Sequence, residues 1–268
     1  MSFSSLRSPL RISLSYHGLA NPAVAARIVA STGLAPPMPV IEIGPGEGML
    51  TDALLRRGFP VSAVESDPQL AAQLRERHRG QPSLRVVQQD FLRYGLPSQG
   101  RYAVVANPPF ARTSEILRRL LGASNPPYHA SLVLQREAAF RWGGLQGETA
   151  LSVVSKVRFE FAIQMAVRRR DFRPYPAVDC VVLGITKRPA ALLEPAVRER
   201  FARFVQLGFG RGRGTLRKNL APELSYVAFR AVARRTNLEL DALPSEASIS
   251  HWLALFGRDG EAHTVLGK

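Results

Sequence analysis

The segment Asn107-Pro108-Pro109-Phe110 combines residue types that can activate a weakly nucleophilic amine. The exocyclic amine of a nucleobase is a poor nucleophile because its lone pair is delocalised into the ring. Hydrogen bonds from that amine to the Asn107 side chain and the Pro108 carbonyl would favour a tetrahedral, nucleophilic nitrogen. Prolines fix the backbone and remove N–H donors, which leaves nearby carbonyls free to accept. Phe110 could stack on an extruded base, so the segment predicts chemistry on a base amine.

Three residues upstream stand where predicted strands end, namely Gly44, Glu65 and Asp90. Glycines in the turn 44–48 let the backbone approach a ligand. An acid at Glu65 can accept from both hydroxyls of a ribose, and Asp90 could accept from an adenine amino group. Each residue alone could be an ordinary turn or cap residue, but together they indicate an adenosine-containing cofactor. Position 49 is not the third glycine of the dinucleotide fingerprint, and there is no Walker lysine, so the pattern favours S-adenosylmethionine.

Short apolar runs alternate with helical patterns through the first two thirds of the chain, which predicts a parallel sheet with helices on both faces. From about residue 190 the apolar spacing is helical and strand runs are absent from the sequence. We therefore expect a catalytic domain over residues 1–188 and an all-helical C-terminal domain over residues 189–268. The predicted strands cover residues 40–43, 61–65, 84–87, 102–106, 131–134, 159–165 and 178–185.

The net charge of +15 and the sequence pI of about 11.1 favour a polyanionic partner, because each cation set against a phosphate releases a counterion. A basic protein without a nucleic-acid role remains the alternative. Cys180 is the only cysteine, so we expect neither disulfides nor a cysteine metal site, and we predict no metal. No apolar run is long enough to span a bilayer and no signal peptide is recognisable, so we expect no membrane association and a cytoplasmic location.

Basic residues cluster around the predicted catalytic strand ends. Residues 1–188 hold 24 Arg and Lys against 13 Asp and Glu, whereas residues 189–268 hold 12 against 8, so most of the surplus lies in the first domain. Such clusters can form a channel for a nucleic-acid backbone, although a charge run is often only a solvated face. The residues predicted to bind RNA are Arg112, Arg168, Arg169, Arg170, Arg211 and Lys218.

Taken together, the motifs resemble those of the rRNA adenine N6-methyltransferases. That family includes the Erm type, which acts on 23S rRNA, and the small-subunit dimethyltransferases. The resemblance covers about residues 15–258 and implies a Rossmann-like, S-adenosylmethionine-dependent methyltransferase sheet with a small helical C-terminal domain. It is carried by the segments at residues 41–48, 65–68, 89–91, 107–110, 132–137, 151–153, 172–174, 176–179, 216–220 and 252–253.

The resemblance also implies site residues. The chain departs from the family at Tyr16-His17-Gly18-Leu19, where Gln-Asn-Phe-Leu or Gln-His-Phe-Leu is usual. It departs again at Pro108, where the family has an aliphatic residue and DNA adenine methyltransferases more often have proline. The catalytic residues implied are Asn107, Pro108 and Phe110, and the cofactor-binding residues implied are His17, Leu19, Gly44, Gly46, Glu65, Asp90, Phe91 and Asn107.

The leading hypothesis is a monomeric Erm-type enzyme that methylates an adenine of 23S rRNA, either protein-free or in an assembly intermediate. Such an enzyme confers macrolide-lincosamide-streptogramin B resistance. The segment around Trp142 and the short C-terminal half favour this type. The alternatives are a 16S rRNA dimethyltransferase acting in ribosome assembly, a DNA adenine methyltransferase, and a nucleic-acid-binding protein without catalysis.

Overall fold

The computed structural model describes residues 17–210 and 214–257, and the chain divides into two compact units. Unit 1 comprises residues 1–139 and 161–187, and unit 2 comprises residues 140–160 and 188–268. Unlike the predicted domains, unit 2 also takes in residues 140–160.

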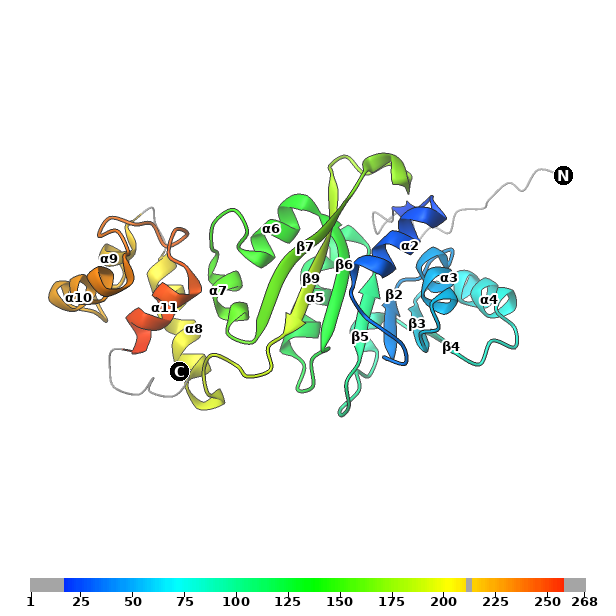
Figure 1. Cartoon of the computed structure of the whole chain (residues 1–268), viewed down its shortest axis with the longest axis horizontal. Coiled ribbons are helices and arrows are strands. Elements are labelled where there is room, and N and C mark those ends of the chain that lie inside the picture. The colour runs from blue at the N-terminus through cyan, green and yellow to red at the C-terminus, as the bar shows by residue number, and fades with distance from the viewer. Residues whose placement is uncertain (1–16, 211–213, 258–268) are drawn as a thin grey trace. The chain divides into compact units, whose positions relative to one another are not determined.

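A seven-stranded sheet has the strand order β4-β3-β2-β5-β6-β9-β7 (Figure 1). The pairs β2–β3, β3–β4, β2–β5 and β5–β6 are parallel. Strands β3 and β5 lie on opposite sides of β2, so the strand order reverses there, at the point where open α/β sheets bind ligands. The strands are β2 (Val40–Ile43), β3 (Val61–Glu65), β4 (Leu84–Gln88), β5 (Ala103–Ala106), β6 (His129–Gln135), β7 (Phe159–Val167) and β9 (Cys180–Lys187).

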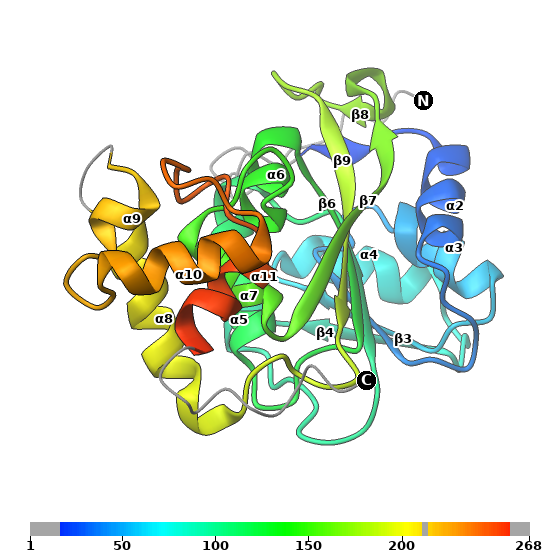
Figure 2. The same cartoon turned by 60° about the vertical axis from the view of Figure 1, so that its left-hand side comes forward.

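The prediction of a wholly parallel sheet is wrong, because β9 pairs with β6 in the antiparallel sense. A parallel neighbour must be reached by a crossover connection, usually a helix. Between β7 and β9 the chain forms only the 3₁₀ turn η3 (Arg169–Asp171) and the short strand β8 (Phe172–Arg173). Strand β8 pairs with β1 (Gly18–Leu19) in a separate two-stranded sheet, and Figure 2 shows it in the connection beyond the ends of β7 and β9.

Helices cover both faces of the sheet because the central strands carry buried apolar residues on both of their faces. Val40 packs in one core with α2 (Pro22–Ser31) and α3 (Met49–Arg56), whereas Ile41 and Ile43 point to the opposite face. The remaining helices of this part are α4 (Pro68–Arg77), α5 (Thr113–Gly122) and α6 (Arg136–Gly143). Asp67 caps α4 as predicted, accepting from the Gln69 N–H at 2.8 Å.

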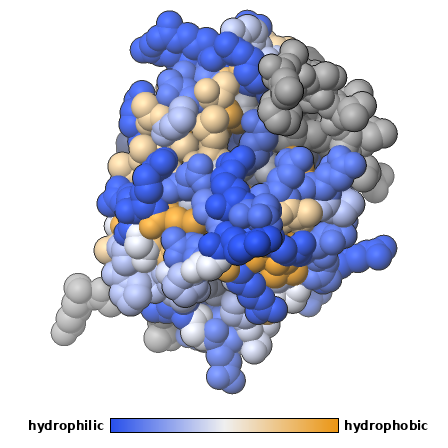
Figure 3. All heavy atoms as spheres, turned by 90° about the vertical axis from the view of Figure 1, so that its right-hand side faces the viewer, coloured by the Kyte–Doolittle hydropathy of each residue, from blue (hydrophilic) through white to orange (hydrophobic). Residues whose placement is uncertain are grey.

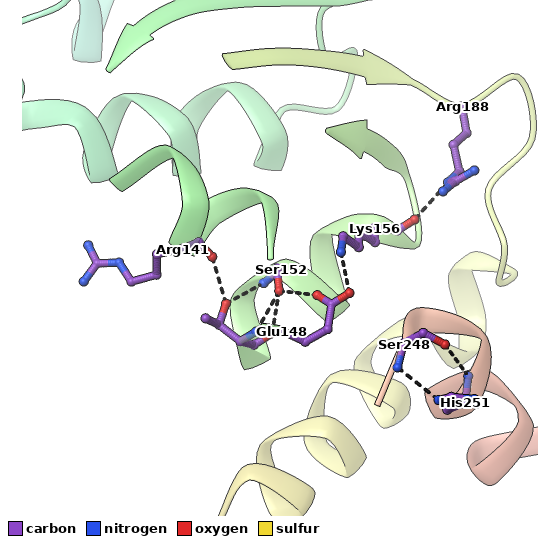
Figure 4. Close-up of polar contacts among 8 residues, drawn as sticks. Arg141, Glu148, Ser152, Lys156, Arg188, Ser248 and His251 are labelled. Carbon is purple, nitrogen blue, oxygen red and sulfur yellow. Dashed lines mark hydrogen bonds and ion pairs between the residues drawn. The ribbon is translucent and has the colours of Figure 1, made fainter. Parts of the chain in front are cut away.

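Within the described residues after 188, unit 2 contains helices and no strand, in agreement with the helical spacing. Their apolar faces enclose Phe201, Phe229 and Trp252, all fully buried. Glu148 accepts from Ser152 Oγ at 2.6 Å and pairs with Lys156, which ties the first helix of the unit to the preceding loop (Figure 4). The helices are α7 (Ala150–Lys156), α8 (Pro195–Phe209), α9 (Leu216–Asn219), α10 (Tyr226–Thr236) and α11 (Ile249–Phe256).

Among the described residues, none of the helices combines the length and apolarity needed to cross a bilayer. The side of the molecule shown in Figure 3 is mostly hydrophilic, with small apolar patches.

Candidate active site

The glycine turn after β2 holds the acid at the end of β3. Gly44 and Gly46 have φ angles of 63° and 57°, values that glycine adopts without strain. In this conformation the Gly46 N–H donates to Glu65 Oε2 at 3.0 Å, while the Asp67 N–H donates to Glu65 Oε1 at 2.9 Å. Two backbone donors therefore fix a carboxylate that is only 5% exposed.

A pocket of about 670 Å³, counting its solvent-open mouth, lies at the carboxyl ends of β2, β3 and β4. Four of the predicted cofactor-binding residues line it, namely Gly44, Glu65, Asp90 and Phe91. The remaining lining residues are Ile43, Val64, Ser66, Asp67, Leu70, Gln89, Leu92, Pro109, Arg112 and Ile116.

Asp90 begins the 3₁₀ turn η1 (Phe91–Arg93) and accepts from the Leu92 N–H at 2.9 Å. Arg112, the last residue of the turn η2 (Phe110–Arg112), donates to both Asp90 oxygens at 3.1 and 3.3 Å. Partial burial raises the pKa of Asp90, but these hydrogen bonds and the arginine charge outweigh it, so the net pKa is lowered. The predicted RNA ligand Arg112 therefore lies inside the pocket, paired with a predicted cofactor ligand.

A second pocket of about 270 Å³ contains Asn107 and shares Gly44 with the first. Asn107 is 7% exposed and its Nδ2 donates to the His17 carbonyl at 2.7 Å, which orients the side chain. Within the part of the chain that the structure describes, the buried Asn107 Oδ1 accepts no hydrogen bond. A buried acceptor without a donor is costly, so this oxygen has the capacity to accept a hydrogen bond from a ligand or an ordered water. The other lining residues are Leu19, Glu42, Pro45, Glu47, Met49 and Leu50.

Glu42, which sequence reasoning missed, lies in the second pocket at 1% exposure. Burial raises the pKa of this carboxyl to about 8, although Thr51 Oγ1 donates to it at 2.6 Å. An acid in the middle of an otherwise apolar strand that leads into a glycine turn is a signal that could have found it. Because its raised pKa keeps Glu42 mostly protonated near neutral pH, this carboxyl can donate as well as accept a hydrogen bond in the second pocket.

Three aromatic rings meet beside the catalytic turn. His17 stacks on Phe110 with ring centroids 5.2 Å apart, and Phe172 meets the Phe110 ring edge-on at 6.5 Å. His17 Nδ1 lies 2.8 Å from the Pro174 carbonyl, and β1 pairs with β8 through Gly18–Arg173 and Leu19–Phe172. The structure thus places His17 against Phe110, the aromatic residue predicted to stack on the base, and Leu19 in the second pocket, while Gly46 contacts Glu65 through its backbone N–H.

The arginine run at residues 168–170 is exposed and directly precedes β8. Arg169 Nε donates to the Pro176 carbonyl at 2.8 Å, and Asp171 accepts from the Arg168 backbone N–H. Because β8 is paired with β1, the run is anchored close to Phe110. Lys218 belongs to α9 of unit 2, and Arg211 lies outside the described residues.

The sequence profile of the family described as "Ribosomal RNA adenine dimethylase" matches residues 7–256, nearly the whole chain. The chain belongs to this family. It is thereby a member of a group of S-adenosylmethionine-dependent rRNA adenine N6-methyltransferases, as the sequence predicted, and its two pockets contain groups suited to that cofactor.

Relatives of two kinds are similar to the chain. The rRNA adenine N-6-methyltransferase of Saccharopolyspora erythraea is 34% identical over 87% of this chain, which spans only 61% of that protein's length. The mycinamicin-resistance protein MyrB of Micromonospora griseorubida is 32% identical over 92% of this chain and 78% of its own. Ribosomal RNA small subunit methyltransferase A of Synechococcus sp. (strain JA-3-3Ab) is 36% identical over 89% of both chains.

The crystal structure of the 23S rRNA methyltransferase ErmE superposes with a TM-score of 0.82 at 33% identity, covering 90% of this chain and 98% of that chain. A dimethyladenosine transferase from Plasmodium falciparum superposes at 0.74 with 19% identity. Both likenesses confirm the Rossmann-like methyltransferase fold.

Proposed function

We propose that the protein methylates N6 of an adenine in 23S rRNA and so confers resistance to macrolide, lincosamide and streptogramin B antibiotics. The observation that carries the choice of 23S rRNA is the similarity to ErmE over 90% of the chain. The similarity to MyrB, a resistance protein by name, supports the physiological part. We further propose that the protein acts as a cytoplasmic monomer, with a catalytic domain up to about residue 188 and a helical domain after it.

The first pocket is proposed to hold the nucleoside part of the cofactor. Glu65 would accept from the ribose hydroxyls, and Asp90 would accept from the adenine amino group, with Phe91 beside the ring. The second pocket would hold the amino-acid part near Glu42, since the shared Gly44 connects the two spaces. S-adenosylmethionine supplies an electrophilic methyl group on its sulfonium when it is bound.

Asn107 is proposed to activate the target amine. Its Nδ2 is already engaged by the His17 carbonyl, so its unpartnered Oδ1 is the atom left to accept an N–H of the adenine. A hydrogen bond that draws this hydrogen out of the plane of the ring favours a tetrahedral nitrogen. The lone pair of such a nitrogen is less delocalised into the ring and can attack the methyl carbon. The Pro108 carbonyl would accept the second N–H, and Phe110 would stack on the flipped base.

The exposed arginines at residues 168–170 are proposed to bind RNA phosphates, because they are anchored through β8 close to Phe110. Lys218, and Arg211 outside the described residues, are proposed as further contacts. An RNA strand held there would present an unpaired adenine to the catalytic turn.

A second candidate function is dimethylation of 16S rRNA. It is favoured by the 36% identity to a small subunit methyltransferase A over 89% of both chains. The two candidates share the same chemistry and differ in the RNA that delivers the adenine.

In vitro methylation separates the candidates. Purified protein and radiolabelled cofactor are incubated with protein-free 23S rRNA, 16S rRNA or duplex DNA, and the modified position is mapped by reverse-transcription stops and nucleoside mass. The proposal expects N6-methyladenine in 23S rRNA and none in the other two. Label only in 16S rRNA would support the second candidate, and label only in duplex DNA would refute both.

A further inference from the structure

Arg112 lies inside the cofactor pocket and bridges two acids. Its Nη1 donates to Asp90 Oδ2 at 3.1 Å and to Oδ1 at 3.3 Å, while Nη2 contacts Glu115 Oε2 at 3.4 Å. The Arg112 side chain is 27% exposed, so much of the guanidinium is committed to these contacts. A guanidinium held between two carboxylates has little charge left to attract a phosphate.

We propose that Arg112 is a positioning residue for the cofactor, which aims the Asp90 carboxylate at the cofactor's adenine and links that contact to the catalytic turn. This inference rests on the proposed function, because it takes the first pocket to be the cofactor site. It assigns Arg112 to cofactor binding, in place of the RNA binding that the sequence suggested.

Two fixed donors leave Asp90 one orientation. The Leu92 N–H holds Oδ1 at 2.9 Å from within η1, and Arg112 holds both oxygens from the opposite element. The carboxylate still has 36% of its side chain exposed, and Asp90 lines the pocket. A carboxylate oxygen can accept more than one hydrogen bond, so Asp90 can keep Arg112 and also accept from an amino group in the pocket.

The link to the catalytic turn is covalent and short. Arg112 is two residues beyond Phe110, and its N–H donates to the Pro109 carbonyl at 3.0 Å, which closes the turn η2. Pro109 lines the same pocket. A cofactor that tightens the Asp90–Arg112 contact therefore also fixes the residues that follow Asn107.

Asp90 must be ionised to accept from an amino group, and its charged surroundings favour that state. The charges of Arg112 and Arg93 lower the pKa of Asp90. Two acids also lie nearby: Glu115 accepts from the other side of the Arg112 guanidinium, and Glu65 lines the same pocket. Removal of the Arg112 charge should raise the pKa of Asp90. The loss of cofactor affinity at acidic pH should then begin at a higher pH.

Calorimetric titration with S-adenosylhomocysteine tests the proposal. Arg112→Gln should weaken binding about tenfold or more at neutral pH, the effect expected when a hydrogen bond to a charged group is removed. In Arg112→Gln, the loss of cofactor affinity on acidification should also begin at a higher pH than in the unmodified protein. Arg112→Lys should restore part of the affinity at neutral pH and part of this pH dependence. In a cycle with Asp90→Asn, the double variant should lose less than the product of the two single losses. Arg118→Gln removes an exposed charge from α5, the helix that begins directly after Arg112, and serves as the matched control.

The outcomes separate the two levels of inference. If the unmodified protein does not bind S-adenosylhomocysteine, the proposed function itself fails. If it binds and Arg112→Gln matches Arg118→Gln in affinity and pH profile, only the role of Arg112 is refuted. Unchanged cofactor affinity together with a flatter salt dependence of RNA binding would overturn the proposal and make Arg112 a phosphate ligand. Thermal denaturation of each variant shows whether it is folded.

Discussion

Replacing Glu42 by glutamine should make the protein more stable at alkaline pH and leave it little changed at acidic pH. Burial raises the pKa of Glu42 from its usual value of 4.5 to about 8, so the folded protein holds this proton where the unfolded chain has released it. Between those two values the folded state binds more protons, and the free energy of unfolding must fall as the pH rises. Glutamine is neutral at every pH and can still accept from Thr51 Oγ1.

The size of this effect on the free energy of unfolding follows from the difference between the usual and the raised pKa of Glu42. At about 1.4 kcal/mol per pKa unit, the full destabilisation of the unmodified protein above pH 8 is at most about 5 kcal/mol. The stability difference between Glu42→Gln and the unmodified protein should therefore grow by roughly 3 kcal/mol from about pH 5.5 to about pH 8.

Urea denaturation at a series of pH values measures this difference. Because all other titrating groups are common to both proteins, their effects cancel in the comparison. Glu47→Gln changes an exposed acid of the same pocket and serves as the matched control. A Glu42→Gln difference that stays constant across the pH range would refute the reasoning.

Three further changes have defined outcomes. Alanines at the arginine positions 168–170 should weaken RNA binding and flatten the slope of log affinity against log salt by roughly 0.7 to 0.9 for each phosphate that is no longer bound. An unchanged slope would show that these arginines do not bind RNA phosphates. Glu65→Gln should weaken S-adenosylhomocysteine binding, measured by calorimetry, about tenfold or more. If Glu65→Gln bound S-adenosylhomocysteine as tightly as the control Glu199→Gln, which changes an exposed acid, the role of Glu65 would be contradicted. Burial lowers the pKa of His129, so the free energy of unfolding should rise with pH just below the usual value of 6.5, and His129→Gln should remove that rise in acid denaturation curves.

The sequence predicted the elements whose signal is local. The strands β2 to β5 are predictable because their apolar runs lead to a glycine, an acid or an asparagine, and Asp67 is recognisable as a helix cap. These strand ends meet at one edge of the sheet, so the relation of Gly44, Glu65 and Asp90 could be inferred without coordinates.

Contacts between distant segments were not predictable in the same way. The pairing of β1 with β8 joins residues more than 150 positions apart, and two two-residue strands leave no periodic pattern. The antiparallel direction of β9 depends on the path of the connection after β7, which apolar runs do not encode. Arg112 was interpreted as a phosphate ligand from its charge, because its pairing with Asp90 exists only in the folded chain.

The single-turnover methylation rate of Asn107→Ala tests the central claim most directly. With cofactor and 23S rRNA both saturating, the account predicts a rate lower by about two orders of magnitude or more, while the variant still binds RNA and S-adenosylhomocysteine. Asn107→Asp removes the Nδ2 donor to the His17 carbonyl and should also be impaired. A variant Asn107→Ala that methylates adenine at nearly the unmodified rate would contradict the assignment of the buried Oδ1 as the acceptor that activates the amine.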